Sequence, residues 1–352
     1  MEYKKRILIT GPVPPPAGGI SIHIWRLKYL LQDEYELDFI DESSIMKKGI
    51  FNFRSYNPFA YLNKIIKADL IYVQSGSTYL RLFQLLVAKC FFKKIIFTLH
   101  SYPSKKNKFL YFIDSSIFNF AKQIIVVNEN ILPRISLPVE KCIIKNAFLP
   151  PLLKNEPELP EIIVEFLEKA KAEGKTIICS NASRLDLYNN EDLYGMDMCL
   201  EVTQRMNKKG VPVFFIFIVS SIDSKNIYEN YSAKIIDLQI EDTFLLLNIK
   251  LSFVKLIQQA NIVVRPTNTD GDALTVREAL FMNKIILASD VVIRPVGTHL
   301  FKNRDVNDFE NKLEELIQQN KLPQQKVITD ENNSFNEYKL FYTNLINSVL
   351  KN

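Results

Sequence analysis

The sequence feature that most constrains the fold is a repeated alternation of short apolar segments with amphipathic ones. The short segments are rich in β-branched residues and almost continuously apolar, which is typical of strands in a parallel sheet buried on both faces. In the first part of the chain we expect strands at residues 6–10, 36–40, 70–74, 95–99, 124–128 and 142–145. Between them, one helix face is marked by Ile20, Ile24, Leu27 and Leu31. This alternation predicts a doubly wound α/β domain.

The alternation resumes after residues 146–160, a stretch with four prolines and no clear periodicity. Further strands are expected at 176–180, 213–219, 243–247, 261–264 and 284–288, and helices at 195–207, 252–260, 275–282, 308–319 and about 334–350. The 352 residues are long for one domain and suit two. We therefore predict Rossmann-like domains at residues 1–150 and 151–333, followed by a helix at 334–352. Since open α/β sheets bind ligands at the carboxyl ends of their strands, we expect a cleft between those ends of the two sheets.

Composition predicts a soluble, cytoplasmic protein. The chain is 47% hydrophobic and 24% charged, as in globular proteins, and no apolar run reaches the roughly 18 residues of a membrane helix. The chain enters its first strand at once, so we expect no signal peptide. The four cysteines, which show no metal or redox spacing, are expected to be buried free thiols: Cys90, Cys142, Cys179 and Cys199.

The charge is distributed unevenly along the chain. Residues 1–150 carry 21 Lys+Arg and 11 Asp+Glu, a net charge of +10, whereas residues 151–352 carry −5. Aromatic residues stand beside most of the basic clusters, as Phe91 and Phe92 do beside Lys93. Such a surface would suit an anionic membrane or a pyrophosphate-bearing lipid, although solvated lysines beside core aromatics explain any single cluster equally well. We expect peripheral contact of the first domain with the inner face of the cell membrane, and no nucleic-acid partner.

The stretch from Arg265 to Leu280 predicts a ligand site. A short strand is followed by a polar turn with a glycine and then by a helix, whose first N–H groups and positive dipole end favour an anion. Asp270 and Glu278 stand eight positions apart around the turn. Backbone donors for a diphosphate beside carboxylates for sugar or ribose hydroxyls indicate a nucleotide-sugar pocket. An ordinary strand-to-helix connection is the alternative.

Three further positions follow predicted strands. Gly18–Gly19 lies where a helix begins, so the backbone there can approach a ligand closely. His100 and Arg184 each follow a strand at its carboxyl end, where active-site residues of this fold class lie. The arginine could clamp a diphosphate. The alternatives are a structural histidine and a surface arginine, and we expect His23 and His299 to be structural. The glycine loop lacks the G-x-G-x-x-G spacing, which disfavours an NAD site.

Taken together, these residues resemble the retaining GT-B glycosyltransferases of family 4, over essentially the whole chain. The correspondence with the family's motifs runs through Gly18-Gly19, Thr98-Leu99-His100, Ala182-Ser-Arg184, Pro266-Thr267, Asp270 to Leu274, Glu278-Ala-Leu and Asn283 to Asp290. The resemblance implies two Rossmann-like doubly wound domains that face each other across a cleft, with the C-terminal helix crossing back to the first. The first domain would bind the acceptor and the second the donor.

The resemblance also implies the chemistry. It suggests metal-independent, retaining transfer of a hexosyl group from a UDP- or GDP-linked sugar, with no cofactor. The acceptor would be a glycan or a polyprenyl-diphosphate-linked glycan in bacterial surface polysaccharide synthesis. The implied catalytic residues are His100, Arg184 and Asp270. The implied donor site comprises Arg184, Asp270, Gly271, Asp272, Ala273, Leu274, Thr275 and Glu278, while Gly18 and Gly19 line the acceptor side.

This chain departs from the family pattern at three positions. Asp270 replaces a glutamate, Tyr194 stands where the family has a lysine for the diphosphate, and Ala273 replaces a glycine. Asp270-Gly-Asp272 also spells the Asp-x-Asp metal motif of a different glycosyltransferase architecture, but it opens a helix in the second of two domains, so we expect no metal. Two alternatives stay open: a nucleotide-sugar epimerase of the same architecture, and a catalytically weakened subunit that binds a nucleotide sugar.

Overall fold

The computed structural model describes residues 4–15, 18–102, 108–222, 225–271, 273–320 and 331–351. The chain forms two compact units. Unit 1 combines Met1–Pro150 with Asp330–Asn352, and unit 2 is Pro151–Thr329. Each has its own parallel sheet and its own hydrophobic cores.

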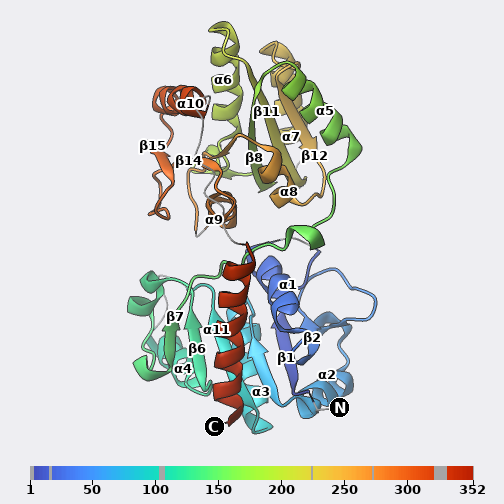
Figure 1. Ribbon diagram of the computed structural model, residues 1–352. Helices are drawn as coiled ribbons and strands as arrows, with labels where there is room; N and C mark the ends of the chain where they lie inside the picture. Colours follow the sequence, from blue (N-terminus) through green and yellow to red (C-terminus); the bar gives the residue numbers. More distant parts are fainter. Residues whose placement is uncertain are drawn as a thin grey trace. The chain divides into compact units, whose positions relative to one another are not determined.

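Unit 1 is built on a seven-stranded parallel sheet (Figure 1). Its strands are β1 (Arg6–Gly11), β2 (Glu36–Asp41), β3 (Phe51–Asn52), β4 (Leu70–Val73), β5 (Lys94–Leu99), β6 (Gln123–Val126) and β7 (Cys142–Ile144). They lie in the order β3-β2-β1-β4-β5-β6-β7. The order reverses between β1 and β4, so the carboxyl ends of these two strands form the topological switch point at which open α/β sheets bind ligands.

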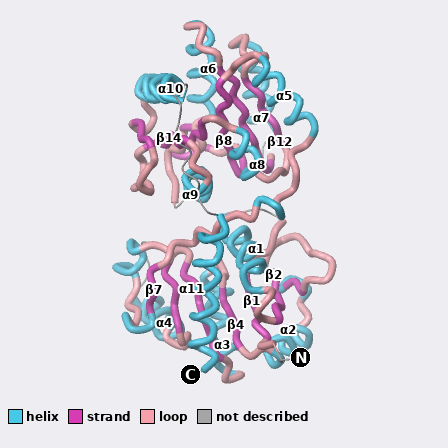
Figure 2. Tube along the Cα trace, in the orientation of Figure 1, coloured by secondary structure: helices cyan, strands magenta, loops and turns pink. Residues whose placement is uncertain are grey.

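Helices cover both faces of this sheet because successive strand residues point to opposite sides. Ile7 and Ile9 of β1 pack in the core under α1 (Gly19–Leu31) and α11 (Glu331–Lys351). Leu8, between them, packs under α2 (Pro58–Lys67), α3 (Thr78–Cys90) and α4 (Lys108–Phe118). Figures 1 and 2 both show α11 beside α1, and the Tyr35 hydroxyl donates to Asn347 Oδ1 of α11 at 2.8 Å. The predicted C-terminal helix therefore packs on the first unit.

Unit 2 is built on a six-stranded parallel sheet in the order β12-β11-β8-β13-β14-β15. Its strands are β8 (Thr176–Arg184), β11 (Val213–Ser221), β12 (Phe244–Asn248), β13 (Ile262–Arg265), β14 (Ile285–Ser289) and β15 (His299–Phe301). The helices α6 (Met196–Lys208), α7 (Lys225–Asp237) and α10 (Val306–Asn320) cover one face, and α5 (Glu161–Ala172), α8 (Phe253–Gln259) and α9 (Leu274–Phe281) cover the other. A short hairpin, β9 (Leu187–Tyr188) and β10 (Glu191–Asp192), follows β8. The switch point of this sheet lies between β8 and β13.

The predicted doubly wound α/β architecture is confirmed, and the structure adds elements that the sequence pattern did not indicate. β3 and β15 contain only two and three residues, too few to show a periodicity. The helices α5 and α7 were also missed. Cys179 and Cys199 are buried as expected, but Cys142 is half-buried and Cys90 is exposed on α3, which corrects the expectation for those two. Within the described ranges, no helix is both long and apolar enough to cross a lipid bilayer.

Candidate functional site

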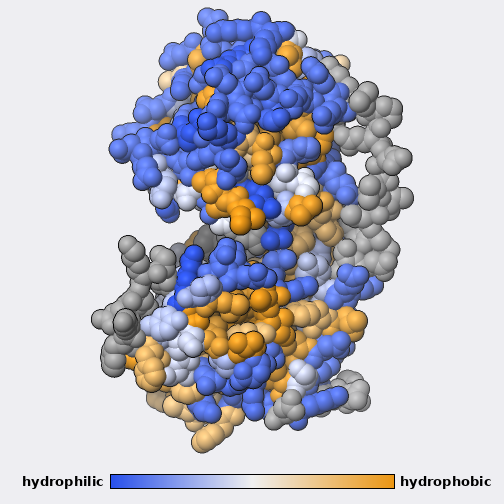
Figure 3. Space-filling view, turned by 90° about the vertical axis from the view of Figure 1, so that its left-hand side faces the viewer, coloured by the Kyte–Doolittle hydropathy of each residue, from blue (hydrophilic) through white to orange (hydrophobic). Residues whose placement is uncertain are grey.

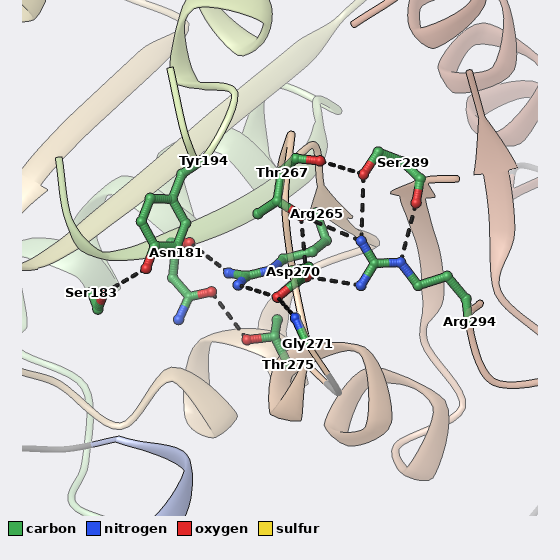
Figure 4. A network of polar contacts seen from close by, with 10 residues as sticks. All are labelled: Asn181, Ser183, Tyr194, Arg265, Thr267, Asp270, Gly271, Thr275, Ser289 and Arg294. Atoms are coloured by element: carbon green, nitrogen blue, oxygen red, sulfur yellow. Dashed lines mark hydrogen bonds and ion pairs between the residues drawn. The ribbon is translucent and has the colours of Figure 1, made fainter. Parts of the chain in front are cut away.

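The predicted site in unit 2 is organised by an arginine at the end of β13. The Arg265 guanidinium binds both carboxylate oxygens of Asp270, with Nε 3.1 Å from Oδ2 and Nη2 3.3 Å from Oδ1. Its Nη1 donates to the backbone carbonyl of Asn181 on β8 at 3.2 Å. Arg265 therefore joins the two strands of the switch point to the turn that precedes α9 (Figure 4).

Asp270 accepts from three further donors. Its Oδ2 receives Nη1 of Arg294 at 2.8 Å and the Thr267 hydroxyl at 3.1 Å, and its Oδ1 receives the Gly271 N–H at 3.0 Å. An ionised carboxylate offers about four lone-pair positions. The five donors therefore use its accepting capacity, and the carboxylate is fixed in orientation.

Arg294 was not anticipated from the sequence. It lies in the loop after β14, and its side chain is only 2% exposed. Its Nε donates to the Ser289 carbonyl at 3.1 Å, while its Nη2 lies 3.3 Å from the Thr267 hydroxyl. No motif spacing marks such a loop residue. We call Asn181, Arg265, Thr267, Asp270, Ser289 and Arg294 the Asp270 network.

The Asp270 network carries a net positive charge. Burial alone would raise the pKa of Asp270, but the charge and hydrogen bonds of Arg265 and Arg294 outweigh burial and hold that pKa below its usual value. The carboxyl is therefore ionised at neutral pH. Two guanidiniums around one carboxylate leave an excess of one positive charge, which favours an anionic ligand.

Tyr194 lies against the network. The Arg265 guanidinium carbon is 5.2 Å from the centroid of the Tyr194 ring, a cation–π distance, and the Tyr194 hydroxyl is 2.5 Å from Ser183 Oγ. The next residue, Gly195, has φ of +67°, and a Cβ there would lie 2.1 Å from the Pro266 carbonyl oxygen. Only glycine permits this close approach, and it places the ring of Tyr194 over Arg265.

The start of α9 is tied to the same strand end. The helix begins at Leu274, one residue before the predicted start, with Ala273 as its N-cap. The Thr275 hydroxyl donates to Asn181 Oδ1 at 3.1 Å. Glu278 is 4% exposed within α9. The predicted Asp272 lies outside the described residues, and with it the Asp-x-Asp motif. Among the residues that the structure describes, no group of three or more His, Cys, Asp or Glu side chains could hold a metal ion.

Arg184 is the last residue of β8, which runs four residues beyond the predicted strand at 176–180, so Arg184 ends the strand rather than following it. Its side chain is 53% exposed, and its Nη2 lies 2.9 Å from Asp186 Oδ2. The backbone of Arg184 pairs with Ser221 of β11, whereas β13 pairs with β8 only at Ile178 and Cys179. Arg184 therefore lies on the part of β8 that continues past its pairing with β13 and is paired with β11 alone.

In unit 1, two histidines are linked through a glutamine at the switch point. His100 Nε2 is 2.7 Å from Gln74 Oε1, Gln74 Nε2 is 3.4 Å from His23 Nε2, and His23 Nδ1 is 2.7 Å from the Ala147 carbonyl oxygen. A carbonyl oxygen only accepts, so His23 carries its proton on Nδ1 and accepts from the Gln74 amide at Nε2. The Gln74 carbonyl then accepts from Nε2–H of His100. We call this the His23–Gln74–His100 chain.

Both rings of this chain are neutral at pH 7. Burial lowers the pKa of His23 to about 4. Burial, together with the charges of His23 and Arg81, lowers the pKa of His100 well below its usual value. With its proton held on Nε2, neutral His100 has its lone pair on Nδ1. Sequence reasoning identified His100 but missed Gln74, because an amide after a strand carries no motif.

The glycine loop begins α1, as predicted. Gly18 is the N-cap, and its N–H donates to Ser21 Oγ at 2.8 Å. A Cβ on Gly19 would have no described atom within 4 Å, and one on Gly18 would meet only Ser21 Oγ at 3.9 Å. Packing against the described residues therefore does not require glycine at either position.

Comparison with known proteins defines the fold family. No family model matches the sequence, and no curated protein sequence matches it. HepE of Anabaena in complex with UDP matches with a TM-score of 0.68 and 12% identity, over 98% of this chain and 99% of that chain. A glycosyltransferase of Rickettsia africae matches with a TM-score of 0.66 and 17% identity, over 99% and 96%. Sucrose-phosphate synthase of Thermosynechococcus elongatus gives 0.61 and 13%, over 98% and 100%.

The chain has the GT-B fold. Each of these matches spans both units, so GT-B similarity is not confined to one Rossmann-like sheet. At identities of 12 to 17% the likeness establishes the GT-B fold, and the reaction has to be argued from the residues. In this GT-B chain the Asp270 network belongs to unit 2, whereas His100 and the glycine loop belong to unit 1.

Proposed function

We propose that the protein is a retaining glycosyltransferase that moves a sugar from a nucleotide-sugar donor to an acceptor. The observation that carries the proposal is the Asp270 network, a net cationic cluster at the switch point of unit 2 beside the N-terminus of α9. A nucleoside diphosphate is the anion that such a site suits. HepE, which shares the GT-B fold, was crystallised with UDP and with UDP-glucose.

The cationic residues would act on the leaving group. Sugar transfer breaks the bond between the anomeric carbon and a diphosphate oxygen, so negative charge grows on the departing nucleoside diphosphate. Guanidiniums bind two phosphate oxygens at once and stabilise that charge. We assign this role to Arg184 and Arg265, together with the N–H groups that follow Gly271. The positive charge then comes from side chains and backbone, and we propose that the reaction needs no divalent metal.

Arg265 compensates for the substitution at position 194. By resemblance, the diphosphate-binding lysine of the family falls on Tyr194. In this chain the Arg265 guanidinium lies over the Tyr194 ring at 5.2 Å, so a cation occupies the neighbourhood that the lysine would serve. The ring holds the guanidinium by a cation–π contact, while Asp270 fixes its orientation.

Asp270 would act primarily as the anchor of this cluster. The resemblance assigns it to the donor sugar's hydroxyls, but its five donors leave no free acceptor position. A sugar hydroxyl would have to displace one of them, and the Thr267 hydroxyl is the neutral side-chain donor that could exchange. Glu278 is assigned to the ribose.

Unit 1 would serve the acceptor. We assign His100 and the Gly18–Gly19 loop to the reacting and acceptor side. The proposed acceptor is a glycan or a polyprenyl-diphosphate-linked glycan at the inner face of a bacterial membrane, within surface polysaccharide synthesis. The +10 net charge of residues 1–150 supports an anionic acceptor or an anionic surface.

A thermal-shift panel tests donor binding first. It compares UDP, GDP, ADP, their common sugar conjugates and NAD, each with and without EDTA. A ligand at a hundred times its dissociation constant should stabilise the protein by about 2.7 kcal/mol. Stabilisation by one nucleoside diphosphate class regardless of EDTA is the expected result. Stabilisation by NAD alone, or by nothing, would contradict the donor site.

Product analysis then separates the three activities. Transfer with retention gives a product whose anomeric configuration, measured by NMR, equals that of the donor. An epimerase would convert the nucleotide sugar with no acceptor present. A binding subunit would be stabilised by the nucleotide and yield neither product.

A further inference from the structure

The outward side of α3 carries a second hydrophobic stripe. Tyr79, Phe83 and Leu86 are 84%, 44% and 41% exposed, and they follow the i, i+4, i+7 spacing of one helix face. The opposite side of the same helix is already buried, since Leu85 and Ala88 are 0% exposed. Packing within unit 1 therefore explains one apolar side of α3 and leaves the other unexplained.

The neighbouring elements extend this stripe. Phe59 of α2 is 84% exposed, Phe112 of α4 is 68% exposed, and Phe92 in the loop after α3 is 93% exposed. The Phe83 ring lies 5.9 Å from that of Tyr61, a buried residue of α2, so α2 and α3 are neighbours. We define the α2–α4 outer face by its exposed hydrophobic residues: Tyr56, Phe59, Ile66, Tyr79, Phe83, Leu86, Phe92 and Phe112.

The two units differ in surface character on the side shown in Figure 3. This view looks at the side of unit 1 on which β7 and α4 lie, with α2 on the far side; hydrophobic residues gather on unit 1 there, whereas hydrophilic residues cover most of unit 2. Exposed apolar patches that exceed the usual scatter mark sites of interaction with a protein or a membrane. For the α2–α4 outer face, the surrounding charge decides between a protein and a membrane.

The chain that forms this face is strongly basic. Residues 54–122 contain eleven lysines and arginines but only two carboxylates, Asp69 and Asp114. Two of the basic residues do not belong to this face, because Arg81 is 0% exposed and Lys94 Nζ donates to the Leu350 carbonyl of α11. Asp114 is 1% exposed and accepts from the Tyr102 hydroxyl at 2.7 Å. Asp69 accepts from the Arg6 N–H at the start of β1 at 2.8 Å. Lys67 and Lys89, at the ends of α2 and α3, are exposed.

We propose that the α2–α4 outer face docks on the surface of an anionic lipid bilayer. Aromatic rings are favourable at the depth of the lipid headgroups. Lysines beside them can keep their ammonium groups among the phosphates while their stems cover apolar surface. This proposal goes beyond sugar transfer and does not depend on it, because docking requires no donor.

Charge disfavours the other occupants. A second copy placed face to face would bring two strongly basic segments together, and like charges across an interface are costly. Single-stranded nucleic acid is held in a basic groove in which bases stack on aromatic rings. Four of the six aromatic residues that define this face lie on the outer sides of helices instead: Phe59, Tyr79, Phe83 and Phe112.

Vesicle co-sedimentation of the full chain tests the proposal. Vesicles of phosphatidylglycerol and phosphatidylcholine in equal parts should bind the protein at least about tenfold more strongly than pure phosphatidylcholine, and less strongly as salt rises from about 0.1 to 0.5 M. The double variant Phe59→Ser/Phe92→Ser should weaken binding to the anionic vesicles by about tenfold or more. Lys67→Glu/Lys89→Glu should do the same by reversing charge.

A matched control uses exposed apolar residues of unit 2. Ile162 on α5 and Ile236 on α7 are 47% and 61% exposed, and Ile162→Ser/Ile236→Ser should leave vesicle binding unchanged. Thermal unfolding without ligand should give the same cooperative transition in all variants, which shows that they are folded, and equal nucleotide-induced shifts separate docking from donor binding. Vesicle binding that is unaffected by both unit 1 variants would overturn the proposal. So would variants that change only the oligomeric state in sedimentation velocity, or wild-type protein that binds an oligo(dT) but not anionic vesicles.

Discussion

The two units place different chemistry at the same topological position. In each sheet the switch point lies between the first strand and the strand that reverses the order, β1 and β4 in unit 1 and β8 and β13 in unit 2. Unit 2 builds an ionic cluster there from Arg265, Asp270 and Arg294. Unit 1 builds the His23–Gln74–His100 chain, whose members are neutral at pH 7. Topology therefore selects where a ligand binds, and the side chains select which ligand.

Burial acts on both sites, and the partners decide the outcome. Burial penalises the charged form of Asp270, but two guanidiniums offset the penalty and its pKa falls below the usual value. His23 is also buried, and its partners are a carbonyl and an amide that bring no opposite charge, so its pKa falls to about 4. The side chains at the switch point of unit 2 therefore stay charged at neutral pH, whereas the histidines of unit 1 stay neutral. The following predictions test this contrast.

The largest effect is expected from Asp270→Ala. Removing the carboxylate leaves Arg265 and Arg294 close together without a counterion, in a site where both are largely buried. Breaking a buried ion pair from one side costs about 3–5 kcal/mol, which urea denaturation would measure. As a control, Asp186→Ala removes the exposed partner of Arg184 and should not change stability measurably. Equal free energies of unfolding for the two variants would show that the Asp270 carboxylate is not needed to balance the charges of Arg265 and Arg294.

The next effect comes from the backbone that brings Tyr194 to Arg265. Gly195→Ala places a Cβ 2.1 Å from the Pro266 carbonyl oxygen at a residue with φ of +67°, and we expect a loss of about 2–4 kcal/mol. Gly174→Ala is the matched control, because its φ is +65° but no atom of the described residues lies within 4 Å of the added Cβ. That variant should lose only about 1 kcal/mol from backbone strain. Thermal unfolding of the two variants compares their losses of stability, and the difference measures the cost of the clash with Pro266. Similar losses would argue against the close approach.

The sequence indicated where the residues of the ionic cluster lie, but not that Arg265 and Asp270 pair, and it gave no sign of the neutral chain in unit 1. Arg265 and Asp270 stand close together in the chain, in a strand-to-helix turn whose anion-binding geometry is a local property. Gln74 and His23 come from separate elements and meet only through tertiary packing, so no spacing indicated their link to His100. Arg294 was missed for the same reason, since it reaches Asp270 from a loop after another strand.

Strand length likewise limited how much of the fold could be predicted from the sequence. Long continuous apolar strands such as β11 were evident, because nine residues show a pattern. β15 has three residues, and its place at the sheet edge is set by pairing with β14. Strand register and the position of edge strands depend on contacts between residues far apart in the sequence. The overall architecture was therefore predicted more completely than the short strands at the sheet edges.

As pH falls, unit 1 should lose stability at a higher pH than the Asp270 network does. A histidine whose pKa is lowered in the folded state binds protons more readily when unfolded, so stability falls as pH drops below the ordinary value of 6.5. For His23, with a pKa of about 4, the loss between pH 7 and pH 5 is about 2 kcal/mol. His100 adds to it in the same direction, with His23 and Arg81 as the charged groups that act on it.

Asp270 behaves oppositely, because its pKa is lowered and it is an acid. The stability it contributes is present above the usual value of 3.8 and is lost only as pH falls through its lower folded value. Hydrogen exchange with mass spectrometry, resolved by peptide, should show unit 1 losing protection between pH 7 and pH 5 while the peptides around Asp270 keep theirs. Substituting His23 by Gln should flatten the pH dependence in unit 1. Simultaneous loss of protection in both units would break the comparison.

The smallest and most specific effect concerns the proton on His100. Gln74 is 0% exposed and supplies the acceptor that holds this proton on Nε2, so Gln74→Leu should release the ring to a mixture of tautomers at a cost of about 1 kcal/mol. Gln74→Glu is the conservative control, because a carboxylate still accepts from Nε2–H and should also raise the pKa of His100. The chain has only three histidines, so ¹⁵N-histidine NMR can resolve each ring and assign it by single substitution. A pure Nε2–H signal for His100 in wild type and in Gln74→Glu, but not in Gln74→Leu, would establish that the neutral site of unit 1 is held in one protonation state by its glutamine. An unchanged tautomer in Gln74→Leu would show that other contacts fix the ring.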